Sequence, residues 1–395
     1  MIDISYFGID LTTIKRAKII SINKRLLLMK NQENANNRFD QTGITTYLKD
    51  EETGENIEVS HIKIEDNNKF LDFVFGVNYV KSTDKRTPFV HIKMSVSSFE
   101  DEHGEKLGNN FKSLSIMEYR LFVQQVKEYL YEEYGILIDI SEVEFENLEI
   151  ANTFFLNKTY KEYSDTLKAM YMFAPVGMKK KEKDKRKDAH GIRYDDDCEY
   201  IATMFIGNGS VGVKAYCKSG QLEEKLSIAF EIDAMRVEVK VKNGIRCSQI
   251  FGKTIYEITD EELKEYYLER VKKDFIKGFE DYIKKGNKLI KLYIKEEREL
   301  NPRGWTQKAI GMVFAMNYYE EKKSKKSETG KVIIEKDISM AFDVQQVLDI
   351  MRKEMKRKST YDIAVRRMSR DIEKLGNKKN NLENANEIIN KMLNV

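Results

Sequence analysis

Apolar and polar residues alternate along several segments of the first hundred residues, which is the pattern of strands with one buried face. The segment "NIEVSHIKI" alternates directly after the turn-like "DEETGE", and together they predict a β-hairpin. The segment "FVHIKMSVSSF" alternates again, with Ile92 and Met94 on one face and His91 and Lys93 on the other. Between them, "FLDFVFGV" is a compact apolar run typical of a buried strand. The N-terminal region is therefore predicted to be rich in β-structure.

The segment "SIMEYRLFVQQVKEYLYEEYG" changes to helical spacing, with Phe122 and Leu130 on its apolar face. Ser115 and Glu118 form a capping box at its start, in which each side chain accepts a hydrogen bond from a backbone N–H that the helix leaves without a partner. Gly135 provides the C-terminal stop, because glycine adopts the left-handed conformation that often follows a helix. The pattern predicts a helix between these two signals.

Strand patterns return after this helix. In "ILIDISEVEFENLEI" the apolar positions shift from odd to even numbers near Asn147, which predicts a β-bulge there. The segment "EYIATMFIGNGSVGVKAYCKSG" predicts a hairpin around "GNGS", and "AMRVEVKVKNG" is a further strand with a glycine stop.

Helical patterns dominate beyond Ile258, where Thr259 and Glu262 form a second capping box. The expected fold class is α+β, with two parts. An antiparallel β-sheet with packed helices is expected over residues 1–252, followed by an α-helical C-terminal domain over residues 253–395. The sequence contains no internal repeat.

Composition narrows the class of protein. Of the 395 residues, 41% are hydrophobic and 34% are charged, so the chain can bury a core beneath a heavily ionised surface. The net charge of +3 excludes a simple polycation, so any contact with nucleic acid must come from local patches. The charged segment 177–197 has little to bury and is predicted to be a solvated, mobile loop.

The three cysteines, Cys198, Cys217 and Cys247, lack CxxC spacing and predict neither a zinc site nor a disulfide framework. The N-terminus carries acids where a signal peptide needs basic residues. No apolar run approaches the ~20 residues that span a bilayer. A cytoplasmic protein with no membrane partner is expected.

Candidate chemistry comes from the polar sides of three predicted strands, which we expect to share one face of the sheet. Successive side chains on a strand point to opposite faces, so the residues between the apolar positions gather on one side. On these strands they are Lys214, Tyr216, Lys218, Arg236, Glu238, Lys240, Lys242, Glu142, Glu144 and Glu146.

These side chains are the ones that a metal-assisted tyrosine transesterase needs. A phenol has a pKa near ~10, so Tyr216 is a poor nucleophile at neutral pH until a cation or a base stabilises its phenoxide. Carboxylates that hold a hard divalent ion would polarise the scissile phosphate. Lysine and arginine would offset the charge that builds on the phosphoryl oxygens.

Each of these residues also has a purely structural interpretation. A tyrosine on a strand commonly packs its ring and leaves its hydroxyl in water. An alternating Arg-Val-Glu-Val-Lys strand is typical of a half-exposed strand with cross-strand ion pairs. His91 is a candidate metal ligand, but a single histidine on a strand is commonly structural or solvated. The "DDD" at 195–197 adjoins the charged segment and is interpreted as solubilising.

Three segments, in order, carry a resemblance to a known family. The first, "HIKMSVSSFEDEHGEKLGNNFKSLSIMEYRLFVQQVKEYLYEEYGILID", leads from a strand through a Gly/Asn loop into a helix. The second, "MFIGNGSVGVKAYCKSGQLEE", is a glycine/serine hairpin with a Tyr-x-Lys strand and an acidic turn. The third, "MRVEVKVKNGIRCSQIFGKTIYEIT", is an Arg-x-Glu strand followed by "FGK". From about Ile92 to Thr259, the chain resembles filamentous-phage gene II/X-type replication initiators and related plasmid Rep proteins.

The resemblance implies a protein that nicks one DNA strand at an origin through a tyrosyl–DNA intermediate and so starts rolling-circle replication. It implies Mg²⁺ or Mn²⁺ held by acidic residues. Carried over to this sequence, Tyr216 is the nucleophile, and Lys218 and Arg236 are the catalytic cations beside it.

The implied metal ligands are Glu238 and one of Glu144 or Glu146, with His91 as a further candidate. The segment "EVEFENLE" lacks the arginine of the family's Arg-x-Asp pattern, so the choice between the two earlier glutamates stays open. Cys217 stands where the family has Asp after the tyrosine, and "HIK" offers only one histidine. Other tyrosines remain alternatives for the nucleophile, namely Tyr160, Tyr163 and Tyr200.

A second nucleic-acid signal lies in the helical segment 344–374, where basic residues gather around a break at Ser359-Thr360. One expectation is that two helices joined by so short a turn form a helix-turn-helix, with the second helix, 361–374, in a major groove. The alternative is two amphipathic helices with solvated basic faces. The expected DNA-contacting residues are Arg352, Lys356, Arg357, Lys358, Arg366, Arg367 and Arg370.

Three functional hypotheses follow. The first is a replication initiator of a phage, plasmid or other mobile element. Its expected partners are origin DNA, single-stranded or cruciform, a host helicase, and a second copy in a homodimer. The second is a non-catalytic DNA-binding regulator of a mobile element that keeps the sheet without the active site. The third is an interaction protein whose charges serve only solubility.

Overall fold

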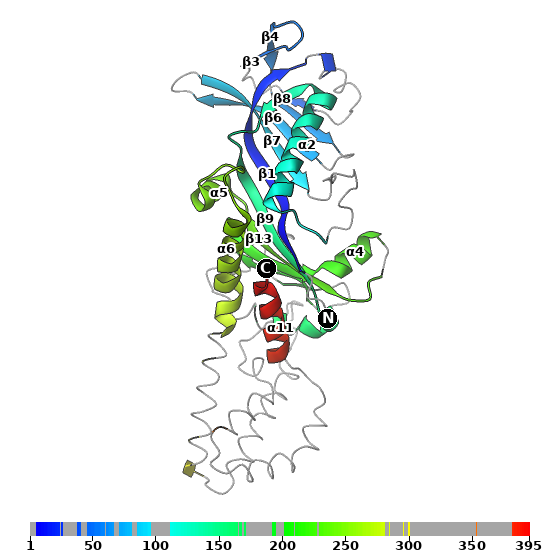
Figure 1. The fold of residues 1–395 in the computed structure, drawn as a ribbon, viewed down its shortest axis with the longest axis vertical. Coiled ribbons are helices and arrows are strands. Elements are labelled where there is room, and N and C mark those ends of the chain that lie inside the picture. The colour runs from blue at the N-terminus through cyan, green and yellow to red at the C-terminus, as the bar shows by residue number, and fades with distance from the viewer. Residues whose placement is uncertain are drawn as a thin grey trace, which may run out of the picture.

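The protein, seen in a computed structural model, is described over residues 5–23, 46–59, 111–164, 201–208, 210–226, 229–280 and 381–395, together with the strands 38–40, 61–66, 71–80, 85–95 and 192–194 and a few single positions. These residues form a large antiparallel sheet with helices packed against it (Figure 1). The predicted α+β fold class, an antiparallel sheet with packed helices, is confirmed.

The described strands of the large sheet run in the order β10-β11-β12-β13-β9-β1-β7-β6-β5-β2, and β8 pairs with β1 off this path. The bounds of the strands on this path, in chain order, are β1 (Ser5–Ile22), β2 (Arg38–Asp40), β5 (His61–Asp66), β6 (Leu71–Val80), β7 (Lys85–Ser95), β9 (Glu144–Phe155), β10 (Ile192–Tyr194), β11 (Ile201–Gly207), β12 (Val211–Cys217) and β13 (Ala234–Val241). Strand β8 is Ile136–Asp139, and β3 (Thr46–Lys49) and β4 (Asn56–Val59) form a separate two-stranded sheet. The first strand therefore lies in the middle of the sheet, between strands from much later in the chain.

Local sequence signals set the turns and the helix ends. "DEETGE" connects β3 and β4, and "GNGS" connects β11 and β12, as predicted. Helix α2 (Ile116–Tyr134) begins at the capping box of Ser115 and Glu118 and ends at Gly135, whose φ is 65°. The register of β9 against β1 shifts between Phe145 and Asn147, so the predicted bulge is confirmed.

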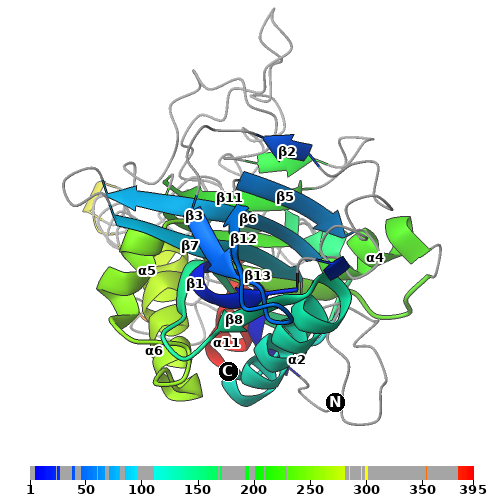
Figure 2. The ribbon, with the colours of Figure 1, turned by 90° about the horizontal axis from the view of Figure 1, so that it is seen from above.

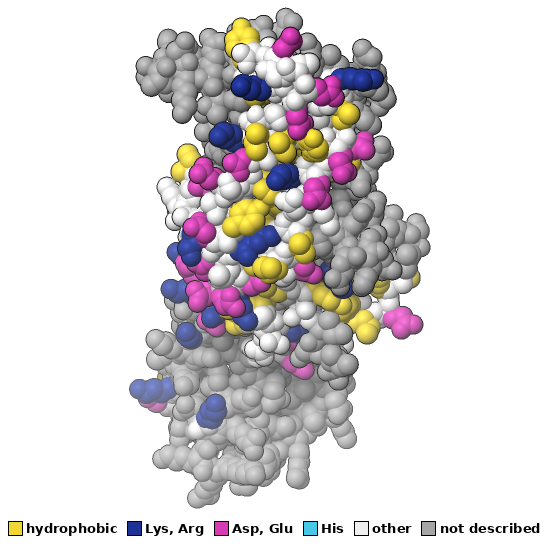
Figure 3. Space-filling view, turned by 45° about the horizontal axis from the view of Figure 1, so that its top comes forward, with side chains coloured by type: hydrophobic (Ala, Val, Ile, Leu, Met, Phe, Trp, Pro, Cys, Tyr) yellow, Lys and Arg dark blue, Asp and Glu magenta, His cyan; other side chains and the backbone are white. Residues whose placement is uncertain are grey.

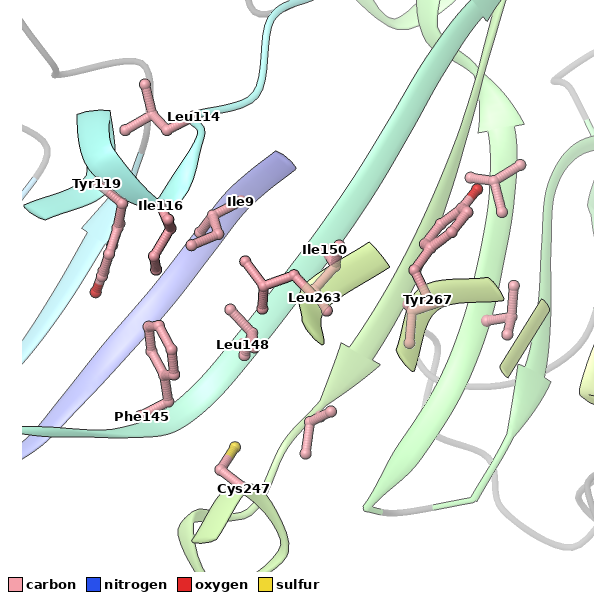
Figure 4. Packing of buried hydrophobic residues seen from close by; sticks show 14 of the residues in the cluster. Ile9, Leu114, Ile116, Tyr119, Phe145, Leu148, Ile150, Cys247, Leu263 and Tyr267 are labelled. Carbon is pink, nitrogen blue, oxygen red and sulfur yellow. The ribbon is translucent and has the colours of Figure 1, made fainter. Parts of the chain in front are cut away.

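Helices cover one face of the sheet (Figure 2). They are α2, α5 (Gly244–Phe251), α6 (Asp260–Arg270) with its π-helical continuation η4 (Val271–Ile276), and α11 (Asn381–Leu393). Beneath them lies the apolar core, in which Ile9 from β1 and Ile150 from β9 are fully buried between Tyr119 of α2 and Tyr267 of α6 (Figure 4). The predicted capping box of Thr259 and Glu262 begins α6.

The C-terminal helix α11 belongs to the same core. Its residues Ala385, Ile388 and Met392 are fully buried. The Lys391 ammonium donates a hydrogen bond to the Phe155 carbonyl of β9 at 2.6 Å. Residues beyond 252 thus pack directly on the sheet, and the predicted boundary between residues 1–252 and 253–395 stays a prediction.

Several predictions concern residues outside the described part of the chain. They include the helices of the segment 344–374 and most of the charged segment 177–197. Within the charged segment, residues 192–194 form β10, which pairs with β11, so a solvated loop is wrong for these three residues. The alternating Ile-Arg-Tyr of this stretch gives it the period of a strand.

The described surface mixes both signs of charge. On the face shown in Figure 3, Lys and Arg side chains lie among Asp and Glu side chains, as expected for a net charge of +3. None of the described helices is both long enough and apolar enough to cross a membrane.

Replacing Ile388 with alanine tests the contribution of α11 to the core. Because this side chain is fully buried against the sheet, we expect the free energy of unfolding to fall by about 2–5 kcal/mol in chemical denaturation. The matched control is Asn386→Ala on the exposed side of the same helix, expected within ~0.5 kcal/mol of wild type. Equal effects of the two variants would show that α11 contributes little to the core.

Candidate active site

The polar sides of β12, β13 and β9 lie on one face of the sheet, opposite the apolar core. Lys214 pairs with Glu238, Tyr216 with Arg236, and Lys240 with Glu149 in the backbone register. The shared polar face predicted from alternation is therefore present. It is not half-exposed, however, because Arg236 is 0% and Glu238 is 2% exposed. The expected half-exposure of β13 is wrong, since both of its faces are covered, but the expected cross-strand ion pairs are present.

A small apolar cluster closes one end of this face. It consists of the buried residues Phe111, Leu222 and Ala234, and Phe230 packs against it. The Phe111 and Phe230 rings meet edge to face, with centroids 5.2 Å apart. Leu222 comes from helix α4 (Lys218–Leu226), which begins directly after β12. The polar residues beside this cluster are therefore shielded from water at that end.

Three carboxylates from three neighbouring strands converge on the polar face. Asp10 of β1, Glu149 of β9 and Glu238 of β13 each offer an oxygen, and these oxygens lie within 4.8 Å of one another. Asp10 stands where the register of β1 against β9 shifts between Ile9 and Leu11. Bulges re-aim side chains, and this one places Asp10 with the two glutamates.

Three cations neutralise the carboxylates. The Lys240 ammonium lies 2.8 Å from Glu149 Oε1 and 3.0 Å from Glu238 Oε2. The Lys214 ammonium lies 3.7 Å from Glu238 Oε2, and the Arg236 guanidinium lies 2.7 Å from Asp10 Oδ1. With all six groups ionised, the three negative charges and the three positive charges cancel.

Tyr216 is hydrogen-bonded to this cluster. Its hydroxyl donates to Glu238 Oε1 at 2.5 Å, and the residue is 5% exposed. The Lys214 ammonium lies over the tyrosine ring, 4.0 Å from its centroid. The phenol is thus placed against a carboxylate that belongs to the three-acid cluster.

The surroundings shift the pKa values of these groups in opposite directions. Burial, and then the negative charge of Glu238, raise the pKa of Tyr216 well above its usual value, so the phenol is protonated. For Glu238, burial acts to raise the pKa, but the charges of Lys240 and Lys214 outweigh it and the net shift is downward. The pKa of Lys240 is raised, because its two glutamate partners outweigh the effect of burial. Glu238 and Lys240 are therefore an ionised pair.

Arg236 holds the cluster together. Its guanidinium donates to Asp10, to Thr153 Oγ1 at 2.7 Å and to the Phe111 carbonyl at 2.9 Å. These contacts join β13 to β1, to β9 and to the segment that closes the face. Since they engage the guanidinium within the protein, they orient Asp10 and favour a positioning role over the phosphate contact that the sequence suggested.

The structure places the other predicted residues apart from the cluster. Lys218 is the first residue of α4 rather than a strand residue, and its ammonium lies 5.8 Å from the Tyr216 ring centroid. The strand ends at Cys217, whose sulfur accepts a hydrogen bond from the Gly220 N–H. Lys214 is the lysine that lies closer to the ring.

Glu144 and Glu146 do not join the three-acid cluster. Glu144 is exposed at the start of β9 and accepts a hydrogen bond from Ser248 at 2.6 Å. Glu146 lies at the bulge, after which the polar side of β9 carries Glu149 instead. The His91 side chain lies outside the described residues, as do the predicted DNA-contacting residues Arg352, Lys356, Arg357, Lys358, Arg366, Arg367 and Arg370.

Sequence reasoning missed Asp10 and Glu149 as members of the site. The signal for Glu149 was available, because the bulge near Asn147 moves the polar side of β9 to odd-numbered residues. Asp10 had no such signal. Its place depends on an irregularity of β1 and on an ion pair with Arg236, 226 residues away.

Comparisons with known proteins were made by sequence and by structure. No protein-family profile and no curated protein matches the chain. Among solved structures, the chain is similar to a rolling circle replication initiator protein from Geobacillus stearothermophilus, with 13% sequence identity and a TM-score of 0.30. The superposition covers 68% of this chain and 85% of that one. The site is therefore interpreted from its own residues.

Replacing Arg236 with methionine tests its role as the centre of the cluster. Removing one partner of a buried ion pair leaves Asp10 without its cation, so we expect the free energy of unfolding to fall by about 3 kcal/mol or more. The control is Arg246→Met, at an exposed arginine on α5. Its free energy of unfolding is expected to lie within ~0.5 kcal/mol of wild type. If the Arg236 variant were as stable as wild type, Arg236 would not be the residue that holds the cluster together.

The lowered pKa of Glu238 predicts a pH dependence. The pKa of Glu238 is lower in the folded protein than in the unfolded chain. Its contribution to the free energy of unfolding is therefore complete above the usual glutamate pKa of about 4.3, and it is lost as pH falls through the pKa of the folded state. Between about pH 5 and 3, wild type should therefore lose more stability than Glu238→Gln. Glu142→Gln, at an exposed position, should follow wild type. If the free energy of unfolding fell equally with pH in wild type and in the Glu238 variant, ionisation of Glu238 would not stabilise the fold.

Proposed function

We propose that this protein is a metal-dependent DNA nicking and joining enzyme of the rolling-circle replication initiator type, with Tyr216 as its nucleophile. The observation that carries the proposal is the 2.5 Å hydrogen bond from the Tyr216 hydroxyl to Glu238, a member of a cluster of three carboxylates. A phenol beside convergent acids is the arrangement that tyrosine transesterification of a phosphodiester requires.

The reaction is a balanced exchange of one ester for another. Tyr216 Oη attacks the phosphorus and forms a new P–O bond, while the bond from phosphorus to the departing deoxyribose 3′-oxygen breaks. The phenol gives its proton first to Glu238, which already accepts its hydrogen bond. The 3′-oxygen takes this proton from Glu238 and leaves as a hydroxyl that a polymerase can extend, and the 5′-phosphate stays on the tyrosine. Reversal of these steps rejoins the strand.

The donor set fits a hard divalent cation such as Mg²⁺ or Mn²⁺. Such ions take oxygen ligands, and Asp10, Glu149 and Glu238 offer three carboxylates from three strands. When bound there, the ion supplies a Lewis acid that favours the phenoxide and offsets charge on the phosphate. The ion matters because Glu238, with its lowered pKa, is a weak base, while the pKa of the phenol is raised.

Access to the nucleophile runs past Lys214. Tyr216 is 5% exposed, whereas the Lys214 side chain above its ring is 26% exposed. This lysine is the cluster's most exposed cation. A phosphate that approaches the phenol meets the ammonium first, and moving Lys214 aside uncovers the ring. Lys214 is thus proposed to bind the scissile phosphate, the role that the sequence gave to Lys218.

A second candidate function is supported by the same cluster. The charges of the three carboxylates and the three cationic side chains cancel on a covered face, so these residues can form a purely structural ion-pair network. A DNA-binding regulator that keeps the sheet without catalysis would have this property. It predicts salt-dependent DNA binding with no metal-dependent strand cleavage.

A covalent-capture experiment separates the two functions. The protein is incubated with Mn²⁺ and either supercoiled DNA that carries the sequences flanking its gene or 3′-labelled single strands of random sequence. We expect a labelled band that survives denaturing gel electrophoresis and is absent with EDTA. The Tyr216→Phe variant should lose at least about a thousandfold of this adduct, because the attacking oxygen is gone.

The matched control is Tyr163→Phe. Tyr163 is also a buried tyrosine that donates to a glutamate, at 2.6 Å from Glu387, but it lies away from the three-acid cluster. This variant should form the adduct as wild type does. An adduct that persists in Tyr216→Phe would refute the assigned nucleophile. DNA retardation without any adduct in wild type would favour the regulator.

A further inference from the structure

Lys240 occupies the position of a cation among the carboxylates. Its ammonium lies 2.8 Å from Glu149 Oε1 and 3.0 Å from Glu238 Oε2, so it bridges two of the three acids. The other two cations of the cluster each pair with one of the acids. Lys214 lies at the longer distance of 3.7 Å from Glu238, and Arg236 pairs with Asp10. Lys240 is the bridging charge at this site.

We propose that Lys240 is a built-in competitor for the divalent cation, and that the metal binds only as this ammonium moves away from the carboxylates. This inference rests on the proposed function, because it takes the three-acid cluster to be the cation site of the nicking reaction. Lys240 then acts as a positioning residue that couples metal binding to DNA binding.

Geometry makes the two cations mutually exclusive. A divalent ion lies roughly 2.0–2.6 Å from its oxygen ligands, and the ammonium already contacts two of the same carboxylates. Charge acts in the same direction. The cluster is neutral with Lys240 in place, and a divalent ion added to it would leave two uncompensated positive charges on a covered face. Departure of the ammonium removes one of them.

The displaced ammonium has a path to water and an anionic partner there. The Lys240 side chain is 13% exposed, so it is not sealed within the cluster. A lysine can extend its four-carbon stem and place its charge at the surface. A DNA phosphate close to Tyr216 would pair with it there. Metal and DNA are therefore expected to bind cooperatively, each favouring the state in which Lys240 has left the carboxylates.

Metal affinity without DNA is the direct test. Mn²⁺ is titrated into the full-length protein by calorimetry, and free Mn²⁺ is counted by its paramagnetic resonance signal. Lys240→Met should bind Mn²⁺ at least about tenfold more tightly than wild type, because the bridging charge is gone. Lys242→Met, at an exposed lysine just beyond β13, should bind within about twofold of wild type.

The coupling is measured by repeating the titration with a short single-stranded oligonucleotide present. Wild type should then bind Mn²⁺ several-fold more tightly, whereas Lys240→Met should show little further gain. Lys240→Gln serves as a second variant that keeps a polar side chain, and circular dichroism checks that each variant is folded. Like Lys240→Met, the glutamine variant should bind Mn²⁺ more tightly than wild type.

Unchanged or weaker Mn²⁺ binding by both folded variants would overturn the competition. Absence of Mn²⁺ binding in wild type and both variants would overturn the cation site itself. These outcomes are distinct from failure of the proposed function. If Tyr216-dependent adducts form but the Lys240 variants bind Mn²⁺ as wild type does, the nicking function is supported and the competition is not. If the Lys240 variants bind Mn²⁺ more tightly but no adduct forms, the protein has a cation site but does not cleave DNA.

Discussion

Burial of the charged face of β13 is the constraint on which the candidate site depends. A charge taken from water into a protein interior costs several kcal/mol unless an opposite charge and good hydrogen bonds offset it. Arg236, with 0% exposure, meets this requirement through contacts to β1, to β9 and to the Phe111 segment. The contacts that stabilise the middle of the sheet are therefore the same contacts that gather the carboxylates around Tyr216.

Much of this arrangement is encoded locally and was predicted from the sequence. The alternation of "AMRVEVKVKNG" placed Arg236 and Glu238 on one side, and that of the preceding hairpin placed Tyr216 beside them. The capping boxes fixed the starts of α2 and α6. These signals are reliable because each depends on a few neighbouring residues and on the period of a single element.

The remaining features depend on contacts that no short segment encodes. Asp10 joins the site through a bulge in β1 and an arginine 226 residues later. The bulge of β9 was visible, but its effect on which glutamate faces the site required the pairing with β1. Lys218 lies outside the polar face because β12 ends at Cys217, one residue earlier than its alternation suggested. The sequence thus predicted the types of residue in the site better than their positions.

The central place of β1 has a consequence for the order in which the chain matures. This strand precedes the other described strands in the chain, yet its neighbour β9 is made more than a hundred residues later and α11 later still. Pairings of such long range close large loops and form slowly. Until they form, an 18-residue strand has unpaired edges that favour aggregation. Chaperone capture of nascent chains is thus expected to matter for this fold, and a fragment without α11 would expose the core residues that Ala385, Ile388 and Met392 cover.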